Sequence, residues 1–305
     1  MLLSFIVPVY NNSAAFAQCR RSLLPLVESG IAEIVAVDDG SVVPLVPDGH
    51  EVRLLRTDHR GAAAARNAGI ETAKGEFVWF VDADDEISTD AIDSFLADLQ
   101  AMDPSVPLFH IGPMVAVSSP GQVPQPVPPD RAATRTAVPL QLLAPRCSIA
   151  DHTTNILRRS WLLQHPEVRY REDMALLEDT VFSLKVIESA ASCLCNDTYR
   201  FYRHHTYHPS STSGAWSAAR SERFTGDVCR FFVFLQQYAA AHSDCPQVAA
   251  YYERMRYVYL RVMAVKGCPR ANLVRLMDVV GAPRRTPRFV YFLFAFLCRK
   301  LRRLK

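Results

Sequence analysis

The sequence has no Cys-x-x-Cys pair among its eight cysteines, so it lacks the ligand spacing of a structural zinc site. It also shows no export signal, because residues 1–3 carry no basic side chain and an apolar run follows at once. We therefore expect reduced thiols and a cytoplasmic protein. No apolar run reaches the roughly 18 residues that a membrane-spanning helix needs.

Basic residues are most concentrated at the end of the chain. Of the 34 basic residues, eight lie between Arg284 and Lys305, where no acidic residue occurs. The rest of the chain is mildly acidic, with 26 basic against 31 acidic residues. A nucleic-acid-binding domain would carry its basic charge on the folded body, so we do not expect nucleic acid as a partner.

The chain has 305 residues, enough for one large α/β domain and a smaller helical addition. Short apolar runs alternate with helix-like segments over the first hundred residues. Strands are predicted at 3–7, 34–37, 52–55 and 77–81, and helices at 13–25, 62–72 and 90–100. This alternation predicts a mostly parallel central sheet flanked by helices.

The later elements are less regular. We predict a strand at 108–117, a proline-rich loop at 118–130, helices at 158–164 and 180–190, a strand at 199–202, and helices over 217–280. The expected organisation is an α/β domain over 1–215, a helical extension over 216–283, and a basic, aromatic tail over 284–305. The aromatic helices at 224–264 suit packing within the chain or against a second copy.

Polar side chains follow three of the predicted strands. Residues 8–11 follow the first strand, residues 38–41 the second, and residues 82–85 the fourth. Ligands of parallel sheets bind beyond the carboxyl ends of the strands, so we expect the three clusters to meet at one edge.

The acidic run at 82–85 predicts a site for a hard divalent cation. Three carboxylates repel one another unless a cation lies among them, and Mg²⁺ typically binds one or two carboxylates plus phosphate oxygens. Such a metal would neutralise a diphosphate leaving group. The structural alternative is a solvated turn whose acidic residues stabilise the next helix.

Other polar residues also have two interpretations. Asp38 and Asp39 suit a hydrogen bond to a base or ribose, or an ordinary turn. Arg66 and Asn67, in an Ala-rich helix, suit contacts to phosphate or to the acidic clusters, or a structural ion pair. The carboxylates that open the helix near residue 180 are either a general base or helix-stabilising residues.

Taken together, these segments resemble the family 2 glycosyltransferases, which have the GT-A fold. The similar segments occur in the family's order at 4–11, 34–41, 61–70, 74–77, 80–85 and 177–182, with a weaker one at 199–203. The resemblance covers roughly residues 3–213. It implies a Rossmann-like sheet and an inverting enzyme that uses a nucleotide-diphosphate sugar, with UDP-sugar favoured.

The resemblance also implies roles for residues. Asp179 is expected to be the base that deprotonates the acceptor hydroxyl, with Glu178 beside it. Mn²⁺ or Mg²⁺ would be bound by Asp84, the second carboxylate of the Asp-x-Asp motif, with Asp82 on the ribose or metal side. The expected donor-binding residues are Pro8, Val9, Tyr10, Asn11, Asp38, Asp39, Arg66, Asn67, Asp82 and Ala83.

The resemblance leaves the acceptor open. We expect a hydroxyl group on a lipid-linked acceptor or on a growing polysaccharide or oligosaccharide. A nucleotidyltransferase is a weaker alternative, because residues 8–12 lack the Gly-rich, basic loop that this class places after its first strand. A non-catalytic nucleotide-sugar-binding protein of the same fold is the other alternative.

The tail contains an apolar, aromatic stretch at 289–298, with basic residues on both sides. This pattern is typical of a helix that lies on an anionic membrane, which predicts peripheral attachment to the cytoplasmic membrane face. The alternative is a helix packed on the domain with a solvated basic end.

Deleting residues 284–305 is expected to move the protein from the membrane fraction to the soluble fraction, because both the basic charge and the apolar stretch are lost. Fractionation of cells that express the full-length and shortened chains measures this. Unchanged partitioning would rule out the membrane interpretation.

Overall fold

The computed structural model describes residues 1–46, 51–90, 92–119, 121–122, 130–143, 149–206, 218–266 and 268–280. The chain divides into two compact units, residues 1–212 and 213–305. The sequence predicts an α/β domain over 1–215, a helical extension over 216–283 and a tail over 284–305. The tail lies outside the described residues.

The N-terminal unit is built on an eight-stranded sheet with the order β3-β2-β1-β4-β9-β6-β10-β8. Its strands are β1 (Leu3–Val9), β2 (Ala32–Asp39), β3 (Val52–Thr57), β4 (Phe77–Phe80), β6 (Leu108–Ile111), β8 (Arg135–Ala137), β9 (Asn155–Arg158) and β10 (Cys193–Asn196). The first four strands are parallel, whereas β9 runs antiparallel to both neighbours and β8 antiparallel to β10. The sheet is therefore mixed, with a parallel half that holds the first four strands.

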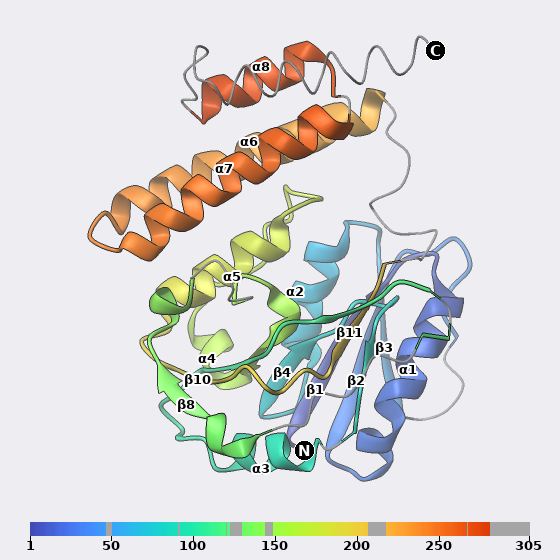
Figure 1. Cartoon of the computed structure of the whole chain (residues 1–305). Coiled ribbons are helices and arrows are strands. Elements are labelled where there is room, and N and C mark those ends of the chain that lie inside the picture. Colours follow the sequence, from blue (N-terminus) through green and yellow to red (C-terminus); the bar gives the residue numbers. More distant parts are fainter. Residues whose placement is uncertain are drawn as a thin grey trace. The chain divides into compact units, whose positions relative to one another are not determined.

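Helices cover the two faces of this sheet (Figure 1). They are α1 (Ser13–Glu28), α2 (Ala62–Thr72), α3 (Asp93–Gln100), α4 (Arg159–Gln164) and α5 (Glu178–Ser189). Phe5 of β1 belongs to the same buried cluster as Phe16 of α1 and Phe95 of α3. The next residue, Ile6, instead faces Gly69 of α2. Because successive side chains of a strand point to opposite faces, α2 lies across the sheet from α1 and α3.

A second, three-stranded sheet has the order β5-β11-β7, from β5 (Glu86–Ile87), β11 (Tyr202–His205) and β7 (Val115–Val117). The predicted strand at 108–117 is thus two strands, β6 and β7, in different sheets. The predicted strand at 199–202 begins three residues later, at Tyr202. This small sheet places β11 directly beside the segment that follows the acidic run.

The C-terminal unit consists of α6 (Ala218–Ala241), α7 (Pro246–Lys266) and α8 (Arg270–Val279) in its described part. The ring of Tyr259 lies 5.8 Å from Phe231 and 6.1 Å from Phe232, so aromatic packing joins α6 and α7. No helix in the described part of the chain is long and apolar enough to span a bilayer.

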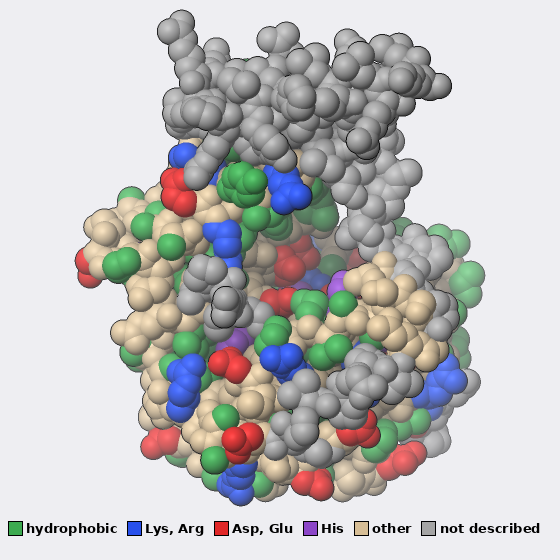
Figure 2. Space-filling model, in the orientation of Figure 1, with side chains coloured by type: hydrophobic (Ala, Val, Ile, Leu, Met, Phe, Trp, Pro, Cys, Tyr) green, Lys and Arg blue, Asp and Glu red, His purple; other side chains and the backbone are tan. Residues whose placement is uncertain are grey.

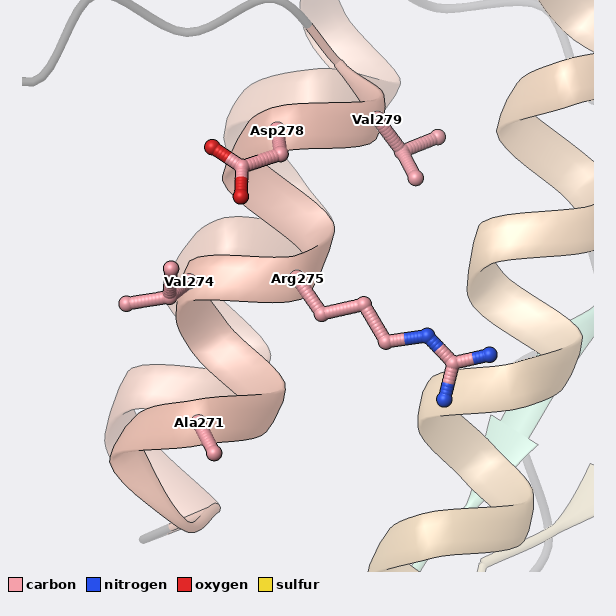
Figure 3. A pocket seen from close by; sticks show the side chains of 5 residues that line it. All are labelled: Ala271, Val274, Arg275, Asp278 and Val279. Carbon is pink, nitrogen blue, oxygen red and sulfur yellow. The ribbon is translucent and has the colours of Figure 1, made fainter.

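One shallow groove of this unit lies along α8 and contains none of the predicted site residues. It is lined by Ala271, Val274, Arg275, Asp278 and Val279 (Figure 3). Arg275 extends from α8 and donates a hydrogen bond of 2.9 Å to Glu222 of α6. The groove is therefore a surface feature of the packing between α6 and α8.

Gly69 determines how closely α2 approaches β1. A Cβ atom at this position would lie 2.3 Å from Cγ2 of Ile6, a stiff, β-branched side chain in the core. We expect Gly69→Ala to lower the free energy of unfolding by about 1–3 kcal/mol through overpacking. Gly226→Ala is the control, because its Cβ would meet nothing closer than 3.7 Å. Denaturant unfolding of both variants measures the effect, and an unchanged Gly69→Ala variant would contradict it.

Candidate active site

The three polar clusters lie at one edge of the sheet. β1 pairs in parallel with β2 on one side and with β4 on the other. Val9, at the carboxyl end of β1, pairs with Asp38, near the end of β2. The segments that follow these neighbouring strands therefore leave the sheet side by side, as the sequence predicts.

Asp38 is completely buried and organises the loop after β2. Its Oδ1 accepts a hydrogen bond of 2.9 Å from the Ser41 amide, and its Oδ2 accepts from the Leu45 amide at 3.0 Å and from Arg56 at 2.9 Å. Burial alone would raise the pKa of Asp38, but these hydrogen bonds and the Arg56 charge hold it below its usual range. Three protein donors already bind this carboxylate, so it shapes the loop at this edge of the sheet.

Asp39 organises the segment that leads into α2. Its carboxylate accepts hydrogen bonds of 2.8 Å from the amides of Arg60 and Gly61 and from Nδ1 of His59. Gly61 has a φ of 95°, which only glycine adopts easily. The His59 ring stacks on Tyr10, with ring centroids 3.9 Å apart and planes 13° apart. Asp39 thus holds the His59 ring, and with it the stacked pair of His59 and Tyr10, at the edge of the sheet.

The loop after β1 has both exposed and buried members. Tyr10 is 44% exposed, whereas the Val9 and Ala83 side chains are buried and leave only their backbone for a ligand. Asn11 has a positive φ of 50°, and its Oδ1 accepts a hydrogen bond of 2.8 Å from the Val42 amide. Pro8 is partly buried. The accessible surface here comes mainly from the Tyr10 ring.

Arg66 joins two carboxylates from distant parts of the chain. Its Nη2 donates to Oδ1 of Asp82 at 2.8 Å, and its Nη1 donates to Oε1 of Glu178 at 2.9 Å. The guanidinium is buried, yet the two carboxylates raise its pKa above the ordinary value, so it stays charged. It also lies over the Tyr170 ring, 5.2 Å from the centroid. Burial would raise the pKa of Asp82, but Arg66 holds it below its usual range.

Glu178 and Asp179 begin α5 beneath this guanidinium. The chain turns into the helix at Leu177, whose φ of 66° is unusual for a bulky side chain. Burial, and then the negative charge of Asp151, raise the pKa of Asp179. Burial and the neighbouring Asp179 likewise raise the pKa of Glu178. A carboxylate with increased proton affinity suits a general base, because its pKa moves towards the operating pH.

Asn67 lies next to Arg66 on α2 but faces a different segment. Its amide donates to the Tyr170 carbonyl at 3.0 Å, and its Oδ1 accepts from the Tyr170 amide at 3.0 Å. A third hydrogen bond, of 3.1 Å, reaches Glu172. The predicted contact of Asn67 with the nucleotide sugar stays a prediction. The observed hydrogen bonds hold the segment whose Tyr170 ring lies against Arg66.

Asp85 is the last residue of the acidic run, and no role of its own was predicted for it from the sequence. It is 1% exposed and accepts hydrogen bonds from the Tyr202 hydroxyl at 2.8 Å, the His205 amide at 2.9 Å and Nδ1 of His204 at 3.1 Å. The Tyr202 hydroxyl in turn accepts from the Asp82 amide at 3.0 Å. The hydrogen bond to Asp85 raises the pKa of His204. The only sequence signal was the weak similarity at 199–203.

Asp84 lies between these two anchored carboxylates and is partly buried. Within the described residues, no group of three or more His, Cys, Asp or Glu side chains could hold a metal ion by itself. Mg²⁺ sites typically use one or two carboxylates, with phosphate oxygens of a ligand completing the coordination. Asp84 and Asp82 are the residues that would supply the protein's share.

Charged side chains gather above this edge. Figure 2 shows acidic, basic and histidine side chains close together on the surface of the N-terminal unit. A Rossmann-like, mostly parallel sheet with acidic residues beyond its fourth strand is the architecture of GT-A glycosyltransferases, and the fold of this chain confirms that prediction. The chain belongs to glycosyl transferase family 2, whose family model matches residues 4–163.

Individual relatives support the same grouping. Glycosyltransferase GlyG of Streptococcus pneumoniae is 34% identical over 113 residues, which cover 34% of this chain and 37% of that protein. The poly(ribitol-phosphate) beta-N-acetylglucosaminyltransferase TarS of Staphylococcus aureus is 29% identical over 202 residues, which cover 62% of this chain and 33% of that protein. The chain thus spans about a third of the length of these two relatives.

A solved structure extends the likeness in three dimensions. Residues 1–349 of S. aureus TarS, in complex with UDP-GlcNAc, match with a TM-score of 0.66 and 21% identity, over 92% of this chain and 80% of that one. At this identity the match establishes the fold.

We expect Asp85→Asn to lower the free energy of unfolding by about 1–3 kcal/mol, because it removes an acceptor from a buried network and leaves donors unpaired. Asp84→Asn, at a more exposed position in the same run, should change it less. Denaturant unfolding compares the two variants, and equal effects would show that Asp85 does not anchor β11.

Proposed function

We propose that this chain is an inverting, metal-dependent glycosyltransferase that moves a sugar from a UDP-sugar to a hydroxyl acceptor. One observation carries the proposal: Arg66 binds both Asp82, in the acidic run, and Glu178, beside the expected base. The buried guanidinium thereby holds the acidic run close to the start of α5, where the expected base Asp179 lies.

The donor part of the proposal rests on the edge formed by β1, β2 and β4. The exposed Tyr10 ring, stacked on His59, offers a flat surface for a nucleotide base. Asp38 and Asp39 hold the two loops around it. S. aureus TarS, which shares this fold, has been crystallised with UDP-GlcNAc, and this supports a UDP-sugar donor here.

The metal part of the proposal assigns Asp84 as the main protein ligand of Mn²⁺ or Mg²⁺, with Asp82 beside it. Bound there, the cation would neutralise charge on the diphosphate leaving group. The low pKa of Asp82 supports this, since the carboxylate stays ionised without the metal.

Asp179 takes the proton from the acceptor hydroxyl in this proposal. A single displacement inverts the anomeric centre and needs the base on the face opposite the departing diphosphate. The raised pKa of Asp179 favours proton uptake, and the partner of Glu178 is already Arg66. We therefore assign the base to Asp179 and a supporting role to Glu178.

The acceptor and the location belong to the same proposal. TarS is a poly(ribitol-phosphate) glycosyltransferase, which supports a polymeric or lipid-linked hydroxyl acceptor for this chain. The basic tail at 284–305 would attach the enzyme to the cytoplasmic membrane face.

A screen of nucleotide sugars for nucleoside diphosphate release, with and without Mn²⁺ or Mg²⁺, tests the proposal. We expect release that depends on the metal, and a fall of about 10²–10⁴-fold in Asp179→Asn, the usual contribution of a general base. Asp84→Ala should abolish the metal dependence.

Asp93→Asn is the matched control, because this exposed carboxylate begins α3 and lies outside the site. It should retain wild-type rates. No release from any nucleotide sugar, with Asp84→Ala and Asp179→Asn indistinguishable from wild type, would defeat the catalytic proposal.

A further inference from the structure

His152 is a buried polar residue that the proposed chemistry does not use. It begins the short 3₁₀ helix η3 (His152–Thr154) just before β9, and its side chain is 2% exposed. Neither ring nitrogen has a hydrogen-bond partner in the described structure. Buried polar groups without a partner are rare in native proteins, so this one calls for a specific explanation.

Aromatic neighbours hold the His152 ring in place, close to the carboxylate of Asp82. Phe80 and Tyr170 pack against it edge to face, with ring centroids 6.0 and 5.8 Å away. Nε2 lies 3.9 Å from Oδ1 of Asp82, less than about 1 Å beyond the length of a hydrogen bond. Burial, assisted by the Arg66 charge, lowers the pKa of His152 to about 3, so the imidazole is neutral and carries one N–H.

The same Asp82 oxygen already accepts a hydrogen bond from Arg66, at 2.8 Å. A carboxylate oxygen has two lone pairs, so Oδ1 can accept a second hydrogen bond beside the one from Arg66. In the described part of the chain, Arg66 is the only hydrogen-bond donor to this carboxylate. The terminal torsion of Asp is broad and roughly two-fold, so one donor on one oxygen restrains its rotation only weakly.

We propose that His152 is a positioning residue for the donor site: its Nε2–H closes on Asp82 Oδ1 when the nucleotide binds, so that Oδ1 is held from two sides and Oδ2 faces the ligand. This inference rests on the proposed function. Because His152 is buried and acts through Asp82, we expect its effect on nucleotide affinity.

Two variants of similar length separate the hydrogen bond from packing. His152→Met fills the space but has no N–H, whereas His152→Gln keeps a donor. The probe is UDP with Mn²⁺, titrated into the full chain by calorimetry. We expect Kd to rise on the order of tenfold in His152→Met, the size of one lost hydrogen bond to a charged acceptor, and to stay within about threefold of wild type in His152→Gln.

Kinetics provides a second readout. With the UDP-sugar that the wild type hydrolyses, His152→Met should raise KM for the donor while kcat changes little. His110→Leu is the control: this histidine is also fully buried, in β6, but its Nδ1 pairs with Asn155 at 3.0 Å. Its loss should lower the thermal stability and leave the Kd for UDP unchanged.

The inference is overturned if wild type and His152→Met bind UDP equally, or if His152→Met and His152→Gln weaken binding equally. His152→Leu replaces the methionine variant if the latter does not fold. A wild-type chain that neither binds UDP nor releases it from any donor contradicts the proposed function itself, so the two failures are distinguishable.

Discussion

The two ion pairs of Arg66 are the interaction on which the site depends. A buried guanidinium is costly unless it is paired, and removing one partner of a buried pair typically costs about 3–5 kcal/mol. Here the two partners, Asp82 and Glu178, come from the end of β4 and the start of α5. The cost of an unpaired charge therefore keeps α2, the acidic run and the start of α5 together before any ligand binds.

A second buried carboxylate performs a similar task on the other side of the acidic run. Asp85 binds the hydroxyl of Tyr202 and the backbone of β11, while that hydroxyl also holds the Asp82 amide. Asp82 and Asp85 thus have protein partners at the two ends of the run. Asp84 lies between them in the sequence and is partly buried, so adjacent residues of the run have different surroundings.

The local patterns of the sequence predicted the parallel half of the sheet well. The helix at 62–72 has the predicted bounds, and the family and fold predictions are confirmed. The sequence patterns did not predict β9, because this strand has only four residues, lies between a turn and a helix, and runs antiparallel to β4. They gave only a weak sign of the Asp85 network, the similarity at 199–203, and none of His152, because their partners lie far away in sequence. The metal and the individual site roles remain predictions.

The reversal at β9 has a wider consequence for how such a site is assembled. Since β9 runs against β4, with Ile156 opposite Trp79, its beginning lies where β4 ends. The 3₁₀ helix η3, which precedes β9, therefore lies close to the acidic run that follows β4, although it is about seventy residues further along the chain. Substitutions in η3 can alter the surroundings of the Asp82 carboxylate while the pairing of β1, β2 and β4 stays the same. The antiparallel strand thus brings η3, from a different part of the sequence, close to the acidic run.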